Sequence, residues 1–398
     1  MPWRETCVMD EKIRFVMAYL GGEGTMTELA AAYGISRKTG YQALARYRAA
    51  GLAGLAPRSK APVHHGRAMP ADQRARILDL RAERPGWGPK KLRAELLRRW
   101  PETSWPAAST IGDLLRHEGL SARARRRSRR RPARTPLAHA DAPNAVWCID
   151  FKGWFRTRDN VRCDPLTVSD AYSRYLLDCR IVSPTLAGVG PAFERLFALY
   201  GLPAVIRSDN GPPFSTTSCA GLSRLNVWWI KLGIRIELIA PGQPQQNGRH
   251  ERLHRTLKDA TAQPPAADPA AQQARFDAFC TDYNRHRPHE ALGQQAPADI
   301  YTVSSRALPG ELREPWYDAD HEVRRVRPNG EIKWRNGRVF LSESLAGELV
   351  GLKASADGHC LVRYFDYDLG VITPDNRTLR RFGPARPGRA KAAQTQNT

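Results

Sequence analysis

Three carboxylate residues stand where a divalent cation could bind. Asp150 lies inside the otherwise apolar run AVWCIDF, Asp209 follows the strand-like run PAVIRS, and Glu251 lies in the first turn of a predicted basic helix. A charge inside an apolar strand is costly unless something pairs it, and metal coordination is one such pairing. Because ligand sites in α/β sheets gather at the ends of strands, the three side chains could converge on one cation.

Each carboxylate also has a structural interpretation. The sequence Asp209-Asn210-Gly211 is an ordinary turn, Glu251 would favour the positive end of a helix dipole, and Asp150 could pair with an arginine. For any one residue alone, the structural interpretation is at least as good as the metal site. Their order along the chain and their flanking residues together favour the metal site.

The charge of the chain points to a polyanionic partner. The 398 residues include 62 Lys and Arg against 40 Asp and Glu, a formal net charge of +22. Nucleic acid is the commonest partner of so basic a protein, and an anionic membrane surface is the alternative. The chain shows no apolar run of the roughly 18 residues that a membrane span needs and no secretory signal. Its seven scattered cysteines form no C-x-x-C pair, so we expect an intracellular protein without a zinc site or a disulfide framework.

Residues 1–56 predict a first helix-turn-helix unit. Thr25 and Glu28 form a capping box at the start of a short helix, and Ser36 can cap the next helix, which ends at Gly51. Two short helices around a tight turn, the second basic at its start, are typical of DNA-binding domains of this kind. A generic three-helix bundle with a solvated basic face is the alternative. The expected DNA contacts are Arg37, Lys38 and Gln42.

Residues 69–120 predict a second helix-turn-helix unit. Thr110 with Asp113 is predicted to form another capping box at the start of a helix. Gly119 is a natural C-cap at the end of the same helix. The repetition supports both assignments.

An arginine-rich linker is predicted over residues 121–139. Between Ser121 and Pro136 it holds eight arginines and no acid, so it cannot bury a core. A solubilising segment is one interpretation. Its place between two folded regions favours contact with a phosphate backbone, through residues such as Arg126, Arg127 and Arg130.

Residues 140–302 change to alternating strands and helices. Three strand-like runs precede a helix, further strands and the helix that carries Glu251, an order that predicts an α/β core with a mixed sheet. Residues 315–383 instead hold short alternating segments between Asn-Gly and Asp-Gly turn signals, which predict a small antiparallel β-barrel. Residues 384–398 form a basic tail that we expect to be disordered.

Four segments together resemble the catalytic core of integrase-type insertion-sequence transposases, which are relatives of retroviral integrases. The segments are WCIDFKG, RSDNGPPF, PGQPQQNGRHERLHRTLK and YNRHRPHEALGQQAPADIY. The resemblance extends over nearly the whole chain, including the two helical units. It implies a multidomain protein with an RNase H-like core and a DDE triad, in which Asp150, Asp209 and Glu251 are both the catalytic residues and the metal ligands. The forty-one residues between Asp209 and Glu251 exceed the usual spacing, and the surplus lies in STTSCAGLSRLNVWWIKLG, an insert expected of one subgroup.

The resemblance also implies cofactors, partners and a reaction. It implies magnesium, as two ions with manganese as an alternative, because carboxylate oxygens suit such cations. The reaction would be cleavage of the ends of the element and their transfer into target DNA, by a protein that binds the terminal inverted repeats. The partners would be double-stranded DNA and at least one further copy of the chain, in the cytoplasm of a prokaryote and associated with the nucleoid.

The predicted helix around Glu251 adds three candidate DNA contacts. His254, Arg255 and Lys258 follow Glu251 by three, four and seven residues, so they share its face and could hold phosphates. In relatives a basic residue seven positions after the glutamate lies close to the DNA end, which makes Lys258 the leading candidate. Asp170, a fourth carboxylate near the sheet, has no ligand role in the family and is expected to be structural.

Two other functions compete with a transposase. One is a DNA-binding regulator on a core that has lost activity, which the presence of all three acids disfavours. The other is an RNase H-like nuclease for RNA–DNA hybrids, which would have no use for two DNA-reading units.

Overall fold

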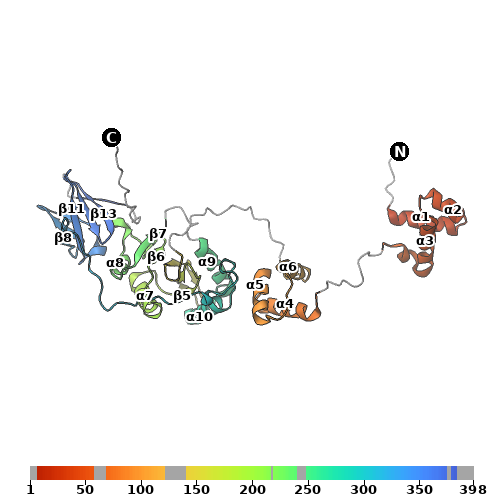
Figure 1. Cartoon of the computed structure of the whole chain (residues 1–398), viewed down its shortest axis with the longest axis horizontal. Coiled ribbons are helices and arrows are strands. Elements are labelled where there is room, and N and C mark those ends of the chain that lie inside the picture. Colours follow the sequence, from red (N-terminus) through yellow and green to blue (C-terminus); the bar gives the residue numbers. More distant parts are fainter. Residues whose placement is uncertain are drawn as a thin grey trace. The chain divides into compact units, whose positions relative to one another are not determined.

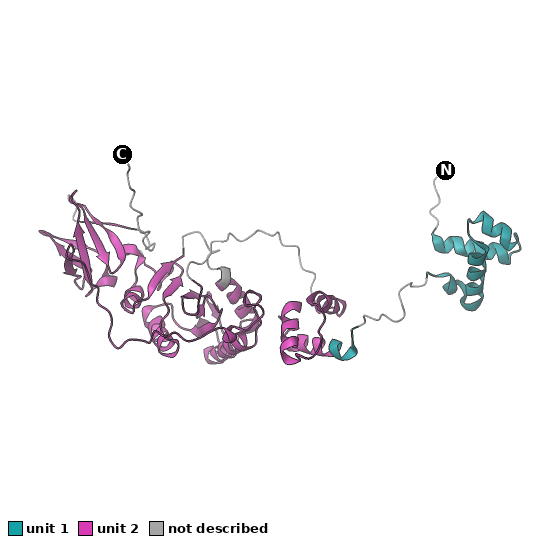
Figure 2. Ribbon diagram, viewed as in Figure 1, with its two compact units in different colours: residues 1–74 teal, residues 75–398 magenta. Residues whose placement is uncertain are grey.

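The computed structural model describes residues 7–57, 69–121, 140–216, 218–239, 248–373 and 378–382. The chain divides into two compact units, residues 1–74 and 75–398 (Figure 2). The linker residues Arg126, Arg127 and Arg130 lie outside the described residues, and so does the tail.

The first unit is helical, as expected. Its elements are α1 (Val8–Leu20), α2 (Met26–Ala32), α3 (Arg37–Ala50) and η1 (Gly51–Leu55) (Figure 1). The capping box at α2 is present, because the Thr25 hydroxyl accepts from the backbone of Glu28 and the Glu28 carboxylate accepts from the backbone of Thr25. Gly40 lets α3 approach the other two helices, since a Cβ there would lie 2.7 Å from both Met26 and Phe15.

The second set of helices comprises α4 (Ala71–Glu83), α5 (Pro89–Arg99) and α6 (Ala108–His117). Its interior is built from Ile77, Leu80, Leu92, Leu96 and Ile111, all buried. The capping box predicted at Thr110 is wrong. Helix α6 begins two residues earlier, without a side-chain cap, and Asp113 pairs with Arg116 one turn further on.

The predicted α/β core has a mixed five-stranded sheet in the order β5-β4-β1-β6-β7. Its strands are β1 (Val146–Phe151), β4 (Pro165–Asp170), β5 (Leu176–Ile181), β6 (Val205–Ser208) and β7 (Arg235–Leu238). Strands β5, β4 and β1 pair antiparallel, whereas β1, β6 and β7 pair parallel. A small hairpin joins β1 to β4, and four helices complete this part: β2 (Phe155–Arg156), β3 (Arg162–Cys163), α7 (Leu186–Tyr200), α8 (Arg224–Lys231), α9 (Gly248–Thr261) and α10 (Pro269–Arg285).

The predicted C-terminal β-barrel is wrong in its closure. The described strands form an open sheet in the order β14-β13-β12-β11-β8 and a separate pair, β9 and β10. Their bounds are β8 (Glu322–Arg325), β9 (Glu331–Trp334), β10 (Gly337–Phe340), β11 (Leu349–Ala354), β12 (Cys360–Tyr364), β13 (Tyr367–Ile372) and β14 (Leu379–Arg381). Turn signals specify hairpins, and hairpins are the same in an open sheet and in a barrel. Closure depends on strand tilt and stagger, which those signals do not encode.

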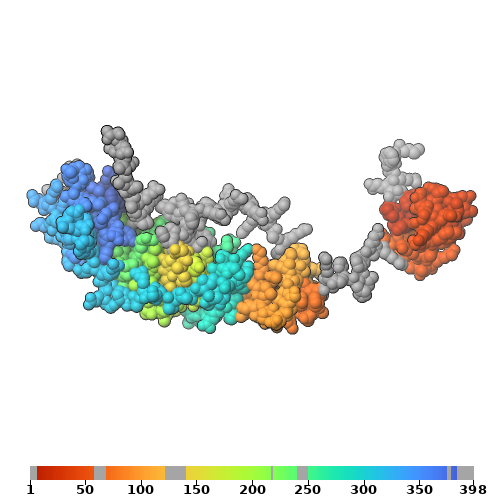
Figure 3. Space-filling model, viewed as in Figure 1, coloured from red at the N-terminus to blue at the C-terminus, as the bar shows by residue number. Residues whose placement is uncertain are grey.

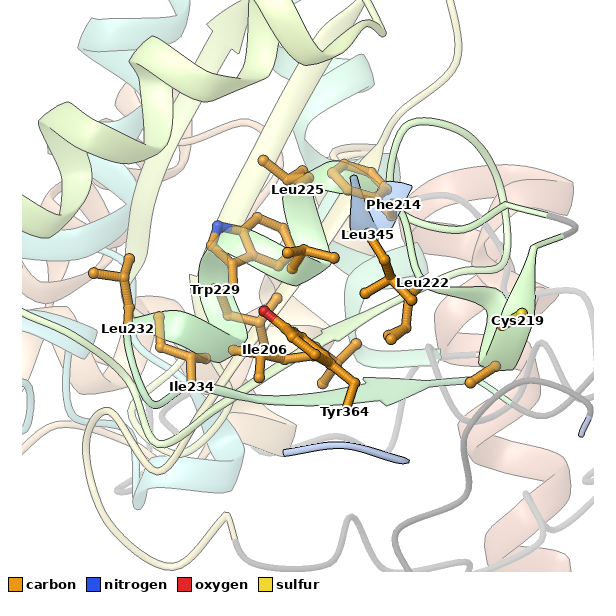
Figure 4. Close-up of a cluster of buried hydrophobic side chains, with 14 of the residues drawn as sticks. Ile206, Phe214, Cys219, Leu222, Leu225, Trp229, Leu232, Ile234, Leu345 and Tyr364 are labelled. Atoms are coloured by element: carbon orange, nitrogen blue, oxygen red, sulfur yellow. The ribbon is translucent and has the colours of Figure 1, made fainter. Parts of the chain in front are cut away.

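A single cluster of buried apolar side chains runs from the core into the C-terminal sheet (Figure 4). Trp229 of α8 and Ile206 of β6 lie in it together with Tyr364 of β12 and Leu345. The blue C-terminal strands accordingly adjoin the green part of the core in the space-filling view (Figure 3). The two sheets therefore share one hydrophobic interior.

The predicted insert supports this junction. Its described residues form the short helix η2 (Cys219–Gly221) and α8. The Cys219 thiol donates a hydrogen bond to the carbonyl of Leu341 at 2.9 Å, and Lys231 pairs with Glu348 at 3.1 Å. The segment between Asp209 and Glu251 thus supports the C-terminal part of the chain through these contacts.

Candidate active site

Asp150 and Asp209 lie at the same edge of the core sheet. Strands β1 and β6 pair in parallel, with Cys148 opposite Arg207, and each aspartate follows two residues later. Adjacent strands lie about 4.8 Å apart, and residues two apart point to the same face. The Asp209 carboxylate also accepts from the backbone of Gly211 at 3.2 Å, so the expected turn is present as well. The turn thus holds Asp209 at the strand end beside Asp150.

Glu251 is exposed in the first turn of α9. Among the described residues, the one group of three acid, histidine or cysteine ligands within 4.8 Å of one another is Asp318, Asp320 and His321, in the C-terminal part. The ligand atoms of Asp150, Asp209 and Glu251 therefore do not all lie within 4.8 Å of one another.

The hydroxyl of Thr167 connects β4 to both β1 and α9. It donates to the carbonyl oxygen of Asp150 at 3.0 Å and lies 2.7 Å from Nε2 of His250 and 2.8 Å from Nε2 of His254. A hydroxyl has one proton and two acceptor sites, so with its proton on Asp150 it accepts from both imidazoles. Each histidine is then protonated on Nε2. Ser169, 3.4 Å from Nδ1 of His250, can donate to that nitrogen.

Both imidazoles of this network are neutral at physiological pH. Burial lowers the pKa of His250 to about 3, and burial followed by the charge of Lys152 lowers the pKa of His254 to about 4. His250 directly precedes Glu251, so these hydrogen bonds attach the start of α9 to the sheet beside the third acid. The network therefore fixes where the first turn of α9 can lie.

The contacts of His254 indicate a positioning role, and its predicted contact with DNA stays a prediction. Its ring is largely buried, bonded to Thr167, and has Nδ1 4.0 Å from a carboxylate oxygen of Asp150, which is too long for a hydrogen bond. A neutral, buried imidazole suits the positioning of α9 better than the holding of a phosphate by charge. His250 and His254 are four residues apart, so a helix places them on one face; this spacing is the signal by which the sequence could have indicated the pair. Thr167 gave none.

A basic cavity of about 720 Å³ opens beside the network. Arg255 and Lys258 line it, as do His254 and the residues Lys152 and Trp154 that follow β1. Burial, and then the nearby charge of Lys258, lowers the pKa of Lys152. The sequence interpretation did not single out Lys152 or Trp154, although both follow Asp150 within four residues.

The remaining predicted residues have simpler surroundings. Arg37, Lys38 and Gln42 are exposed on the first two turns of α3. Asp170 is structural as expected, because its buried carboxylate accepts from the backbones of Asn144 and Ser173 at 2.8 and 2.7 Å.

Comparisons with known proteins match these parts of the chain. Models of the Integrase core domain match residues 140–244 and 232–297, a Helix-turn-helix domain matches 11–62, and a Homeodomain-like domain matches 39–115. A 31.7 kDa protein of insertion element IS407 from Burkholderia multivorans is 32% identical over 232 residues, which cover 57% of this chain and 79% of that protein. The chain belongs to the insertion-element transposases with an integrase core domain. It is thus a polynucleotidyl transferase, of an enzyme family that depends on a metal ion, and its helix-turn-helix region indicates DNA binding.

A second insertion-element protein and a solved integrase domain are also similar to the chain. A 39.2 kDa protein of insertion element IS476 from Xanthomonas euvesicatoria is 30% identical over 284 residues, or 67% of this chain and 75% of that protein. The solved catalytic core domain of BIV integrase is 22% identical, covers 40% of this chain and 93% of its own, and has a TM-score of 0.31. Within the described part of this transposase, no helix has the length and apolar character needed to cross a membrane.

Proposed function

We propose that the chain binds the terminal inverted repeats of its element, cleaves the DNA at those ends and joins them to target DNA, with Asp150, Asp209 and Glu251 as its catalytic residues and metal ligands. The observation that carries the proposal is the register of β1 and β6. These strands run parallel, so Asp150 and Asp209 lie next to each other at their carboxyl ends. The attachment of α9 to β4 next to Glu251 supports it.

The donor set suits magnesium, with manganese as an alternative. All three candidate ligands are carboxylates, and magnesium prefers oxygen ligands at about 2.1 Å. Two ligands of one such ion can lie at most about 4.2 Å apart, whereas a pair of ions about 4 Å apart accepts a wider set. We propose two ions, because a pair can engage three carboxylates that come from three different elements. When bound, such ions activate the attacking oxygen and stabilise the leaving one.

The protein's own groups would bind and orient the DNA. Arg255 and Lys258 in the basic cavity would contact phosphates near the reacting end. In the first unit, the exposed side chains at the start of α3 would contact the terminal repeat, namely Arg37, Lys38 and Gln42. For the linker arginines Arg126, Arg127 and Arg130, we propose contact with the DNA backbone. The protein would act in the cytoplasm, associated with the nucleoid.

Joining two ends of an element also requires more than one active site. We therefore propose a homo-oligomer, at least a dimer, on DNA. A single copy that joins paired ends by itself would contradict this.

The test is strand transfer by the full chain on duplexes that carry the ends of its element. Asp209→Asn is expected to abolish transfer while leaving DNA binding close to that of the wild type. Glu311→Gln, a change at an exposed carboxylate away from the sheet edge, serves as the control. Equal transfer by wild type and Asp209→Asn would remove the catalytic assignment and favour a DNA-binding regulator. Cleavage of RNA–DNA hybrids in place of transfer would favour a nuclease.

A further inference from the structure

An exposed aromatic ring lies at the rim of the basic cavity. Trp154, just before β2, leaves 57% of its surface exposed and lines the cavity. Its neighbour Phe155 also lines the cavity, but its ring is partly buried and lies edge-on to the buried Phe276, with the ring centres 6.4 Å apart. The contact of Phe155 with Phe276 thus anchors the hairpin, whereas Trp154 is mostly exposed.

Two arginines hold the indole in place. The guanidinium groups of Arg162 and Arg156 lie 5.1 and 5.8 Å from the centre of the Trp154 ring, within the range of cation–π attraction. Each arginine also makes hydrogen bonds within the hairpin region. Arg162 makes two hydrogen bonds to Asp164, and Arg156 donates to the carbonyl of Asn160 at 2.6 Å. The ring is therefore preorganised.

The hairpin that carries the ring is also anchored to the segment before α10. The backbone amides of Arg158 and Asp159 donate to the carbonyls of Ala266 and Ala267, both at 3.0 Å. A ligand that meets Trp154 therefore meets a surface with little conformational freedom left to lose.

The cavity next to the ring selects for negative charge. Its lining includes four basic side chains and one acidic one, Asp259. The basic residues are Lys152, Arg156, Arg255 and Lys258. A flat ring beside such a cluster matches a nucleotide, whose base can stack while its phosphate pairs with the cations. The same cavity reaches His254, 4.0 Å from Asp150, so it adjoins the candidate active site.

We propose that Trp154 is a stacking site for one unpaired base of the DNA strand held at the active site. The base must be unpaired, because within a duplex both of its faces are covered by neighbouring bases. This inference rests on the proposed function, since it assigns a place to DNA that the active site acts on.

The experiment compares two DNA probes of random sequence bound by the full chain. One is a blunt duplex, and the other is the same duplex with a three-nucleotide single-stranded end that contains 5-iodouracil. Trp154→Ala is expected to weaken binding of the overhang probe by roughly tenfold and to leave the blunt duplex almost unchanged. Irradiation of the wild-type complex is expected to cross-link the iodouracil to Trp154.

Two variants serve as controls. Trp154→Phe keeps an aromatic face and is expected to restore most of the preference for the overhang. Trp316→Ala removes another exposed tryptophan, 81% exposed and outside the cavity lining, and is expected to change nothing. Equal loss of both probes in Trp154→Ala, no loss of either, or a cross-link confined to other residues would overturn the proposal.

The outcome can be separated from that of the proposed function. Asp209→Asn is expected to lose strand transfer and to keep the cross-link at Trp154. Transfer that depends on Asp209 without a cross-link at Trp154 would refute the stacking site alone. A cross-link at Trp154 in a protein without transfer would refute the proposed reaction alone.

Discussion

At the scale of single residues, the hydroxyl of Thr167 makes three of the contacts that hold the candidate site together. One oxygen lies within hydrogen-bonding distance of the backbone of Asp150 and of two imidazoles on α9. It therefore links β1, which carries Asp150, to α9, which carries Glu251. Removing it would take one side-chain hydrogen bond from each of these imidazoles.

Thr167→Val is expected to lower the free energy of unfolding by about 1–3 kcal/mol, because it removes the hydrogen bonds of one buried hydroxyl to Asp150 and to two imidazoles. Strand transfer is expected to fall further than this loss explains, since the start of α9 is released. The measurements are denaturant unfolding and single-turnover transfer at saturating DNA, so that binding and turnover are separated.

Thr167→Ser keeps the hydroxyl and is the matched control, expected to retain most of the transfer rate. If Thr167→Val reduces stability but transfers DNA at the wild-type rate while folded, then Thr167 is structural and does not position Glu251.

The sequence made some of these residues predictable and others not. Asp150 could be found because a charge interrupts an apolar strand, and Asp209 because a turn sequence follows one. Thr167 could not, because threonine is ordinary in a strand and its partner His250 is 83 positions away. His254 was predicted to share a face of α9 with Glu251, but the sequence did not show that Thr167 of β4 would contact it.

At the scale of elements, local signals were reliable where the interaction is local. The capping box at Thr25 joins residues three apart and is present, whereas the one at Thr110 failed because α6 begins at Ala108, which places Thr110 inside the helix. The mixed sheet followed from the order of strands and helices. The barrel failed because its closure is a relation between strands far apart in the sequence.

Gly40 offers a test of how tightly α3 packs in the first unit. Gly40→Ala would gain up to about 1 kcal/mol in helix propensity, but the new Cβ would meet Met26 and the buried Phe15 at 2.7 Å. We expect a net destabilisation of about 1–2 kcal/mol. Hydrogen exchange of the full chain should show it as faster exchange across α1 to α3.

The control for this change is Gly86→Ala, at a position where a Cβ meets nothing within 4 Å and φ is not positive. It is expected to be neutral or slightly stabilising. Unchanged exchange in α1 to α3 of Gly40→Ala would mean that these helices have room to separate.

At the scale of the whole molecule, the net charge of +22 predicts how DNA binding responds to salt. Each phosphate neutralised on duplex DNA contributes about −0.9 to the slope of log affinity against log salt concentration. Lys258→Ala is therefore expected to make the slope shallower by about one, and Lys258→Arg to leave it unchanged. Fluorescence anisotropy on a blunt duplex between 50 and 200 mM salt measures both. A slope near zero for the wild type would contradict the electrostatic interpretation of the chain.

The hydrophobic interior shared by the two sheets has a consequence for synthesis on the ribosome. Helix α8 ends at Lys231, yet the cluster that buries Trp229 also needs side chains as far along the chain as Ile372. At the usual rate of translation, roughly 140 residues take on the order of ten seconds. During that interval the emerging core presents an uncovered apolar face, which chaperones can bind and which neighbouring nascent chains can also reach.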